Sequence, residues 1–272
     1  MNQDCKHINF LVMMRGMAAC GLARQHRGGI ECKAMIRFSL LGVQVSIHPT
    51  LWLTLAFLGR AFFATSLVEL MSALLFIIAA FVILLAHEMG HALVGRRLGG
   101  GQPSVYLAWL GGDCTNETAR LTRMQGVVMT AAGPAASLGI GFAAYLLLCL
   151  YVGDFGLGTA LTAGFALGVM PAEVLEAFPP LAMFFFFYLI EVSCWWTLLN
   201  LLPVFPLDGG QIMQGLMKSR QQMHAISLVV AVVLAVFFGC LGLWLLSIFL
   251  VLLAVLNHRL YKESRDGGTD FH

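Results

Sequence analysis

Long apolar stretches, separated by short segments that hold most of the charges, dominate the chain. A stretch of about 20 apolar residues is the length that an α-helix needs to cross the hydrocarbon core of a bilayer. The last apolar block, over 223–257, is divided in two because the run Gly239-Cys240-Leu241-Gly242 at its middle favours a tight turn. The pattern thus predicts six transmembrane helices, at about 46–64, 70–97, 124–152, 181–203, 222–239 and 241–258.

The segment at 99–117, between the second and third predicted helices, has a different pattern. Residues 105–109 (VYLAW) alternate weakly and are bounded by glycine and proline, which favours a strand or a hairpin; a simple membrane-dipping loop is the alternative. The sequence therefore predicts an all-α polytopic membrane protein with about six transmembrane helices and a small β-hairpin or membrane-dipping loop after the second.

Residues 1–34 differ from the rest of the chain. They are basic and lack periodicity, and arginines interrupt every apolar run, so the segment has no usable signal-peptide core. Either it is a cytoplasmic tail or translation starts at Met35, where patterned sequence begins. We expect this N-terminal segment at 1–34, a membrane-embedded core at 35–258 and a cytoplasmic tail at 259–272.

Composition supports a membrane protein. Of the 272 residues, 59% are hydrophobic and 11% are charged, whereas about a quarter of the residues of a soluble domain are charged. So few charges cannot cover the surface of a soluble fold. A soluble enzyme, a disordered protein and a nucleic-acid-binding module are therefore excluded.

The placement of the basic residues predicts the orientation. With six spans, all of the 16 lysines and arginines except Arg60 fall on the side that holds both termini. Loops rich in lysine and arginine stay in the cytoplasm. We therefore expect a multi-pass protein of the cell membrane with cytoplasmic N- and C-termini; five spans would put the C-terminal basic residues outside.

Ionisable side chains inside the predicted spans are the candidates for function, because burying them in a membrane is costly. His87, Glu88 and His91 form an HExxH motif near the cytoplasmic end of the second predicted helix. Histidines four residues apart lie on one face of a helix and can bind one zinc ion, while the glutamate takes a proton from a zinc-bound water. The alternative is a chance match of satisfied polar side chains.

Zinc in a catalytic site normally takes a third protein ligand and leaves one position to water. Asp208 is the best candidate, because the segment that carries it ends the fourth predicted span on the same side as the HExxH motif. Pro203, Pro206, Gly209 and Gly210 break the helix there, and irregular backbone at this depth is tolerated where it is buried or lines a wet cavity. The alternative is a plain exit turn in which Asp208 caps the next helix.

Four segments together resemble the site-2 protease family of intramembrane zinc metalloproteases. They are Ser46-Ile47-His48-Pro49-Thr50, the HExxH motif, Ala132-Gly133-Pro134, and the segment from Asn200 through Pro203 to Asp208-Gly209-Gly210. The resemblance covers about 40–216. No stretch has room for a PDZ or CBS domain, so the chain is similar to the minimal-core group that includes the sporulation-factor type.

The resemblance implies one zinc ion per chain, held by His87, His91 and Asp208, with Glu88 as the catalytic base. It also implies that Asn200 stabilises the oxyanion or holds the substrate, a transmembrane segment of another protein. Ser137 stands where many family members carry asparagine, which leaves the role of that position open. The substrate, the binding residues for it and any regulatory partner are not identified by the sequence.

Two alternatives to a protease are a membrane zinc transporter and a catalytically inactive helix-binding protein. A transporter needs polar residues through the depth of the bilayer, and here they gather at one end; the intact Glu88 argues against an inactive protein. Of the remaining ionisable residues in or near the spans, Glu191 is more readily explained as a structural acid, and no chemistry follows from the position of His48. His224, at the start of the fifth predicted span, completes the list of candidates.

Overall fold

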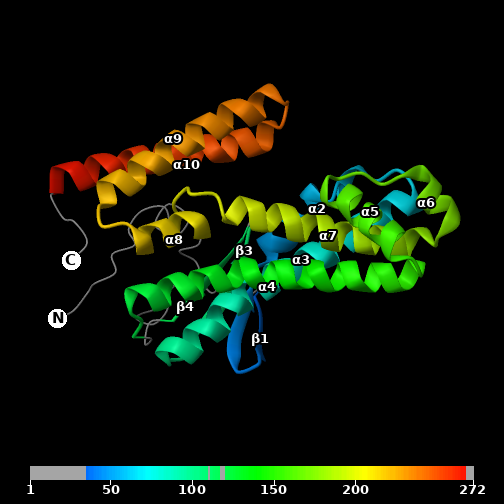
Figure 1. Cartoon of the computed structure of the whole chain (residues 1–272), viewed down its shortest axis with the longest axis horizontal. Coiled ribbons are helices and arrows are strands. Elements are labelled where there is room, and N and C mark those ends of the chain that lie inside the picture. The colour runs from blue at the N-terminus through cyan, green and yellow to red at the C-terminus, as the bar shows by residue number, and fades with distance from the viewer. Residues whose placement is uncertain (1–34, 110, 117–119, 268–272) are drawn as a thin grey trace. The chain divides into compact units, whose positions relative to one another are not determined.

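The computed structural model describes residues 35–109, 111–116 and 120–267 (Figure 1). The expected segment at 1–34 therefore lies outside the described residues. In the described part, five helices are long and apolar enough to cross a membrane: α3 (Leu67–Gly99), α4 (Arg123–Val152), α7 (Pro180–Asn200), α9 (Arg220–Cys240) and α10 (Trp244–Gly267). The chain is thus a multi-pass membrane protein built mainly of helices, as the sequence predicts.

The first predicted span, at 46–64, differs from the structure. Its apolar residues form α2 (Pro49–Leu58) and a single 3-10 turn, η1 (Ala61–Phe63). Ten residues of α-helix extend about 15 Å, roughly half of the hydrocarbon core. The helix ends because Gly59 and Arg60 leave the helical conformation, and Arg60 has a φ of 59°. The described chain therefore has five helices of spanning length, and the segment predicted as the first span forms a shorter apolar helix.

The division of the block at 223–257 into two helices is confirmed. Helix α9 ends at Cys240, the chain turns at Gly242 with a φ of 76°, and α10 begins at Trp244. The two helices pack against each other as an antiparallel hairpin (Figure 1). Helix α10 continues to Gly267, so most of the expected tail at 259–272 is helical.

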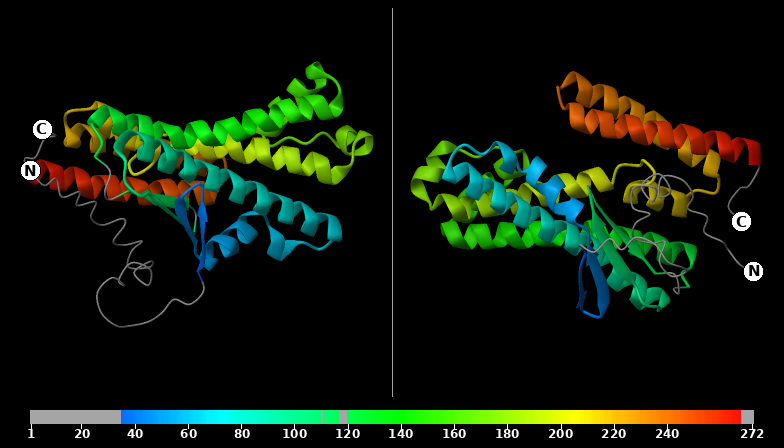
Figure 2. Two further views of the ribbon diagram at one scale, coloured as in Figure 1. Left: turned by 90° about the horizontal axis from the view of Figure 1, so that it is seen from below. Right: turned by 180° about the vertical axis from the view of Figure 1, so that it is seen from behind.

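Four strands form one sheet in the described part of the chain, in the order β1 (Ile36–Leu40), β2 (Val43–Ile47), β3 (Ser104–Ala108) and β4 (Gly111–Thr115). The hairpin of β3 and β4 confirms the prediction for 99–117. The sequence did not predict β1 and β2. Strand β2 pairs in parallel with β3, and β4 forms one edge of the sheet beside α3 (Figure 2).

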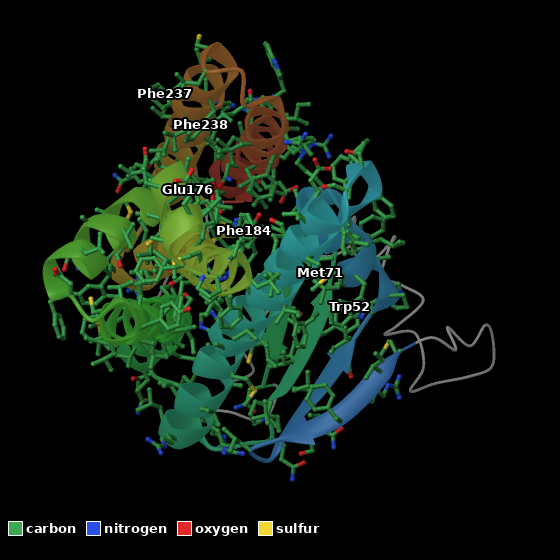
Figure 3. The ribbon with its side chains drawn as sticks, turned by 90° about the vertical axis from the view of Figure 1, so that its right-hand side faces the viewer. Trp52, Met71, Glu176, Phe184, Phe237 and Phe238 are labelled. Atoms are coloured by element: carbon green, nitrogen blue, oxygen red, sulfur yellow. The ribbon has the colours of Figure 1, made fainter. Side chains whose placement is uncertain are left out.

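One face of the sheet packs against α3 through apolar side chains. Burial alternates along β2, as expected for a strand with one buried face. Helix α2 joins the same core, and the ring of Trp52 lies 5.0 Å from that of Phe81 on α3 (Figure 3). This core holds Val43, Val45, Ile47, Leu51, Leu55, Ala80, Leu84, Val105 and Leu107.

Helices α3, α4 and α7 pack on one another and form the second core, which Leu161 and Phe165 of α5 (Phe155–Ala166) complete. The short helix α6 (Ala172–Ala177) lies between α5 and α7 in the sequence, and α8 (Asp208–Leu216) follows α7. Helices α3 and α4 approach closely at Gly90, where an added Cβ would collide with the carbonyl oxygen of Ala132 and lie 2.9 Å from the Cβ of Ala136. Small residues allow such an approach between membrane helices.

We expect Gly90→Ala to destabilise the protein by about 1–3 kcal/mol, because the new methyl group forces α3 away from α4. Thermal unfolding in detergent measures the effect. The control is Gly139→Ala on α4, where a Cβ meets nothing within 4 Å and helix propensity alone favours alanine. Equal melting temperatures for the two variants would contradict the close approach.

Candidate metal centre

His87 and His91 lie one turn apart on α3, on the face that packs against α4. Both are buried, with 2% and 7% of their surface exposed. Their ring centroids are 4.8 Å apart and the ring planes are nearly perpendicular. Gly133 of α4 makes room for the second ring, because an added Cβ there would collide with Nε2 of His91.

Asp208 brings a carboxylate to the same point from a distant part of the sequence. Its Oδ2 lies 2.9 Å from Nε2 of His87 and 3.4 Å from Nε2 of His91. Each of these three side chains offers one donor atom to a metal ion, and the three donor atoms lie within 4.8 Å of one another. Ligand atoms about 2 Å from a tetrahedral zinc ion are separated by about 3.3 Å, so the spacing fits.

The loop after α7 positions Asp208 because two glycines let it fold tightly under α8. An added Cβ on Gly209 would collide with the carbonyl oxygens of Leu201 and Leu202. One on Gly210 would lie 2.5 Å from the carbonyl carbon of Val204. The N-cap residue of α8 is Leu207, and Asp208 is already the first residue of the helix. The alternative interpretation, in which Asp208 caps the next helix, therefore does not hold in the structure.

The hydrogen bonds behind the rings fix which nitrogens face the carboxylate without a proton. Nδ1 of His91 lies 3.0 Å from the carbonyl oxygen of Met129. A carbonyl oxygen only accepts, so Nδ1 carries a proton, and when the ring is neutral its Nε2 presents a lone pair. That lone pair faces Oδ2 of Asp208, another acceptor, for which the described residues supply no hydrogen bond. Acceptors that converge in a buried site fit a bound cation.

Ser137 and Thr197 give His87 a similar support. Nδ1 of His87 lies 3.4 Å from Oγ of Ser137, which is 2.9 Å from Oγ1 of Thr197 and donates to the carbonyl oxygen of Pro134 at 3.0 Å. The serine hydroxyl has one proton and gives it to Pro134, so it accepts from the ring and from Thr197. The sequence pointed to the position of Ser137 but not to Thr197, whose contact depends on the packing of α7 against α4.

Glu88 lies beside the cluster, 6% exposed, with its carboxylate against strand β4. A Cβ on Gly112 would lie 2.5 Å from Oε1 of Glu88, so only glycine fits there. Burial, with the negative charges of Glu88 and Asp113, raises the pKa of the Cys114 thiol on β4 to about 12. The thiol therefore stays protonated at neutral pH.

Asn200 ends α7, just before the loop that carries Asp208. Its Nδ2 donates to the carbonyl oxygen of Trp196 at 2.9 Å. The ring of Trp196 lies 6.1 Å from that of His87. The role of Asn200 in stabilising the oxyanion or holding the substrate stays a prediction.

The other ionisable candidates lie outside the cluster. His48 caps α2, since its Nδ1 accepts from the backbone N–H of Thr50 at 3.3 Å, which explains a histidine before this helix. Glu191 on α7 lies against the turn at Gly168, which has a positive φ. His224 on α9 pairs with Asn257 on α10.

Comparisons with known proteins agree with the motifs. The family model described as peptidase family M50 matches residues 75–241. Stage IV sporulation protein FB of Bacillus subtilis is 26% identical over 230 residues, which cover 82% of this chain and 67% of that protein. The solved structure of the site-2 protease from Methanocaldococcus jannaschii aligns with 88% of this chain and 97% of its own, with a TM-score of 0.48 and 19% identity. The family match confirms the resemblance seen in the sequence.

We expect Ser137→Ala to weaken metal binding by roughly 10–100-fold, the usual effect of removing a group that orients a metal-binding histidine. Titration of the purified protein with zinc against a chelating dye measures the dissociation constant. Ser193→Ala is the matched control, because the buried Ser193 hydroxyl donates to the main-chain oxygen of Ser137 at 2.7 Å and joins the same two helices. If both variants bind zinc equally well, the hydroxyl of Ser137 does not orient His87.

Proposed function

This chain belongs to peptidase family M50, and from that premise we propose that it is a zinc endopeptidase that cleaves other proteins within the membrane. Membership makes it a membrane metallopeptidase. The proposed substrate is a peptide bond in or near a transmembrane segment of another protein. The observation that carries the proposal is the convergence of three metal-binding atoms beside a buried glutamate, on helices of spanning length.

In this proposal His87, His91 and Asp208 hold one zinc ion. A zinc ion in such a site supplies a Lewis acid for the scissile carbonyl and lowers the pKa of a bound water. Glu88 accepts the proton of the attacking water and passes it to the leaving amine. The burial of Glu88 against β4 supports this role, because the side chain lies beside the proposed ligands and is shielded from bulk water.

We assign Asn200 to the carbonyl oxygen of the substrate. Its amide stands at the end of α7, ahead of the loop that carries Asp208, and donates to the main chain of its own helix. A substrate carbonyl offers the same kind of acceptor as the Trp196 oxygen. Rotation of the side chain therefore exchanges one hydrogen bond for another, at little cost in free energy.

The free edge of β4 provides a place for an extended substrate. Among the described strands β4 pairs only with β3, so its other side is an edge. Edge strands accept a peptide as an added strand through main-chain hydrogen bonds. A helix must unwind before its peptide bonds can be hydrolysed, and pairing with β4 beside Glu88 stabilises the unwound form. This makes β4 the proposed substrate-binding element.

The orientation is also a proposal. If the path through α2 and η1 is counted as a crossing beside the five spanning helices, the lysines and arginines gather on the side of both termini, which favours cytoplasmic termini with the metal centre toward the cytoplasmic side. A zinc transporter remains the rival from another class. Purified protein in zinc-loaded vesicles discriminates between them: cleavage of a reconstituted single-span protein supports the protease, and zinc flux without cleavage supports the transporter.

We expect Glu88→Gln to bind one zinc ion per chain as the unaltered protein does, and to lose at least 100-fold in turnover. The amide keeps the size of the carboxylate but cannot accept the proton, and general base catalysis contributes about 10²–10⁴-fold. Metal analysis gives the zinc content, and cleavage of a tagged single-span protein in proteoliposomes gives turnover. Normal cutting by this variant would refute the role of Glu88.

We expect Gly112→Ala to lower turnover strongly while zinc stays bound, because its Cβ would lie 2.5 Å from Oε1 of Glu88 and displace the base from its position. The matched variant is Gly111→Ala, whose Cβ meets only the Trp196 ring, at 3.9 Å. It is expected to lose far less. The same cleavage assay compares the two, and equal losses would show that β4 does not lie against the base as described.

A further inference from the structure

Three polar side chains are buried inside the α9–α10 hairpin, away from the metal ligands. They are His224 and Ser227 on α9 and Asn257 on α10, exposed by 7%, 0% and 0%. Nδ1 of His224 lies 3.0 Å from Oδ1 of Asn257. Both helices are long and apolar enough to cross a membrane, where buried polar groups are costly unless they have partners. Their contacts therefore call for an explanation.

All three converge on one residue of the loop before Asp208. The backbone N–H of Phe205 donates to Oγ of Ser227 at 3.2 Å, and the backbone oxygen of Phe205 accepts from Nδ2 of Asn257 at 2.6 Å. The ring of Phe205 stands edge-on to the ring of His224, with centroids 5.5 Å apart. The hairpin thus satisfies both main-chain polar groups of Phe205. We call His224, Ser227 and Asn257 the Phe205 cluster.

The directions of these hydrogen bonds leave Asn257 one orientation. Its Nδ2 donates to the carbonyl oxygens of Phe205 and Leu253, the second at 2.9 Å. Carbonyl oxygens only accept, so the amide nitrogen must face them. Oδ1 then accepts the Nδ1 proton of His224. Rotating the amide by half a turn would break all three contacts, so the histidine holds the asparagine in its donating orientation.

The position of Phe205 is passed on to Asp208 through tight main-chain packing. The backbone N–H of Leu207 donates to the oxygen of Val204 at 2.9 Å. A Cβ on Gly210 would collide with the nitrogen of Phe205 and lie 2.6 Å from its Cα. The first turn of α8 therefore rests directly on the Phe205 backbone. A shift of Phe205 moves the carboxylate that faces His87 and His91.

We propose that the Phe205 cluster positions Asp208 for metal binding, with Asn257 as the central positioning residue. The inference rests on the proposed function only in taking Asp208 as a metal ligand. The C-terminal hairpin then contributes to the geometry of the metal centre, although α10 lies beyond the family match, which ends at residue 241. Metal sites need their ligands held to about 0.5 Å, and the Asp208 loop has no regular secondary structure of its own.

The test is the zinc affinity of the purified full chain, measured by competition with a chelating dye. Asn257→Leu removes both donors and Asn257→Asp keeps the shape but loses the donor to Phe205. We expect the dissociation constant to rise by roughly 10–100-fold in both. Ser247→Ala is the matched control, since Oγ of Ser247 donates to the oxygen of Ala235 at 2.8 Å and also joins α9 to α10. It is expected to stay within twofold of the unaltered protein.

A second readout separates positioning from general damage to the fold. If the cluster only positions Asp208, saturating zinc restores the turnover of the Asn257 variants, with KM for the substrate unchanged. Should those variants fail to fold, Ser227→Ala removes only the acceptor for the Phe205 N–H and is expected to raise the zinc dissociation constant several-fold. Zinc affinities equal to that of Ser247→Ala in the folded variants overturn the inference.

The outcomes also separate this inference from the proposed function. Loss of zinc binding in Asp208→Ala, together with normal binding in the Asn257 variants, leaves the protease proposal intact and refutes the positioning role alone. Normal zinc binding in Asp208→Ala refutes the ligand assignment on which both depend. Weak binding in the Asn257 variants with no cleavage by the unaltered protein supports the positioning role and removes the protease proposal.

Discussion

The convergence of three electron-pair donors in a buried place is the constraint on which the rest of the structure depends. Two imidazole nitrogens lie 2.9 and 3.4 Å from one carboxylate oxygen of Asp208, and the three donor atoms lie within 4.8 Å of one another. Without a metal ion, a proton on one of the rings must offset the charge of the buried carboxylate. The packing around it lets the three side chains converge: Gly133 clears space for His91, and Gly209 lets the loop turn toward the rings.

Each donor is held from behind by a different part of the fold. The main chain of α4 holds His91 through Met129, while Ser137 of α4 with Thr197 of α7 holds His87. Asp208 begins α8 directly after a loop, and the α9–α10 hairpin holds that loop through Phe205. Helices far apart in the sequence thus meet through polar contacts at the metal centre. Because apolar packing alone gives little orientation in a membrane, these hydrogen bonds supply it.

The sequence predicted what depends on local spacing and missed what depends on pairing between distant segments. The i, i+4 spacing of His87 and His91 fixes their common face in any helix, and the prolines and glycines near Asp208 announce a broken helix. Hydropathy overestimated the first span because it counts apolar residues and does not register the backbone break at Gly59 and Arg60. The contact of Asn257 with Phe205 could not be predicted, since no pattern in either segment indicates which distant segment it packs against.

The parallel pairing of β2 with β3 constrains the path of the chain between β2 and the start of α3, where the sequence predicted a full transmembrane helix. Strand β2 ends at Ile47, level with Leu107 of β3, which follows α3. The chain must therefore run from this end of α3 back to its start at Leu67, and it does so as a short helix, a 3-10 turn and an extended stretch. Helix α2 packs along α3, so this path runs in the direction expected for the predicted span at 46–64, although its helix is shorter than a span. The strand β2 thus lies at the end of α3 that carries His87 and His91, and it braces the β3–β4 hairpin against Glu88.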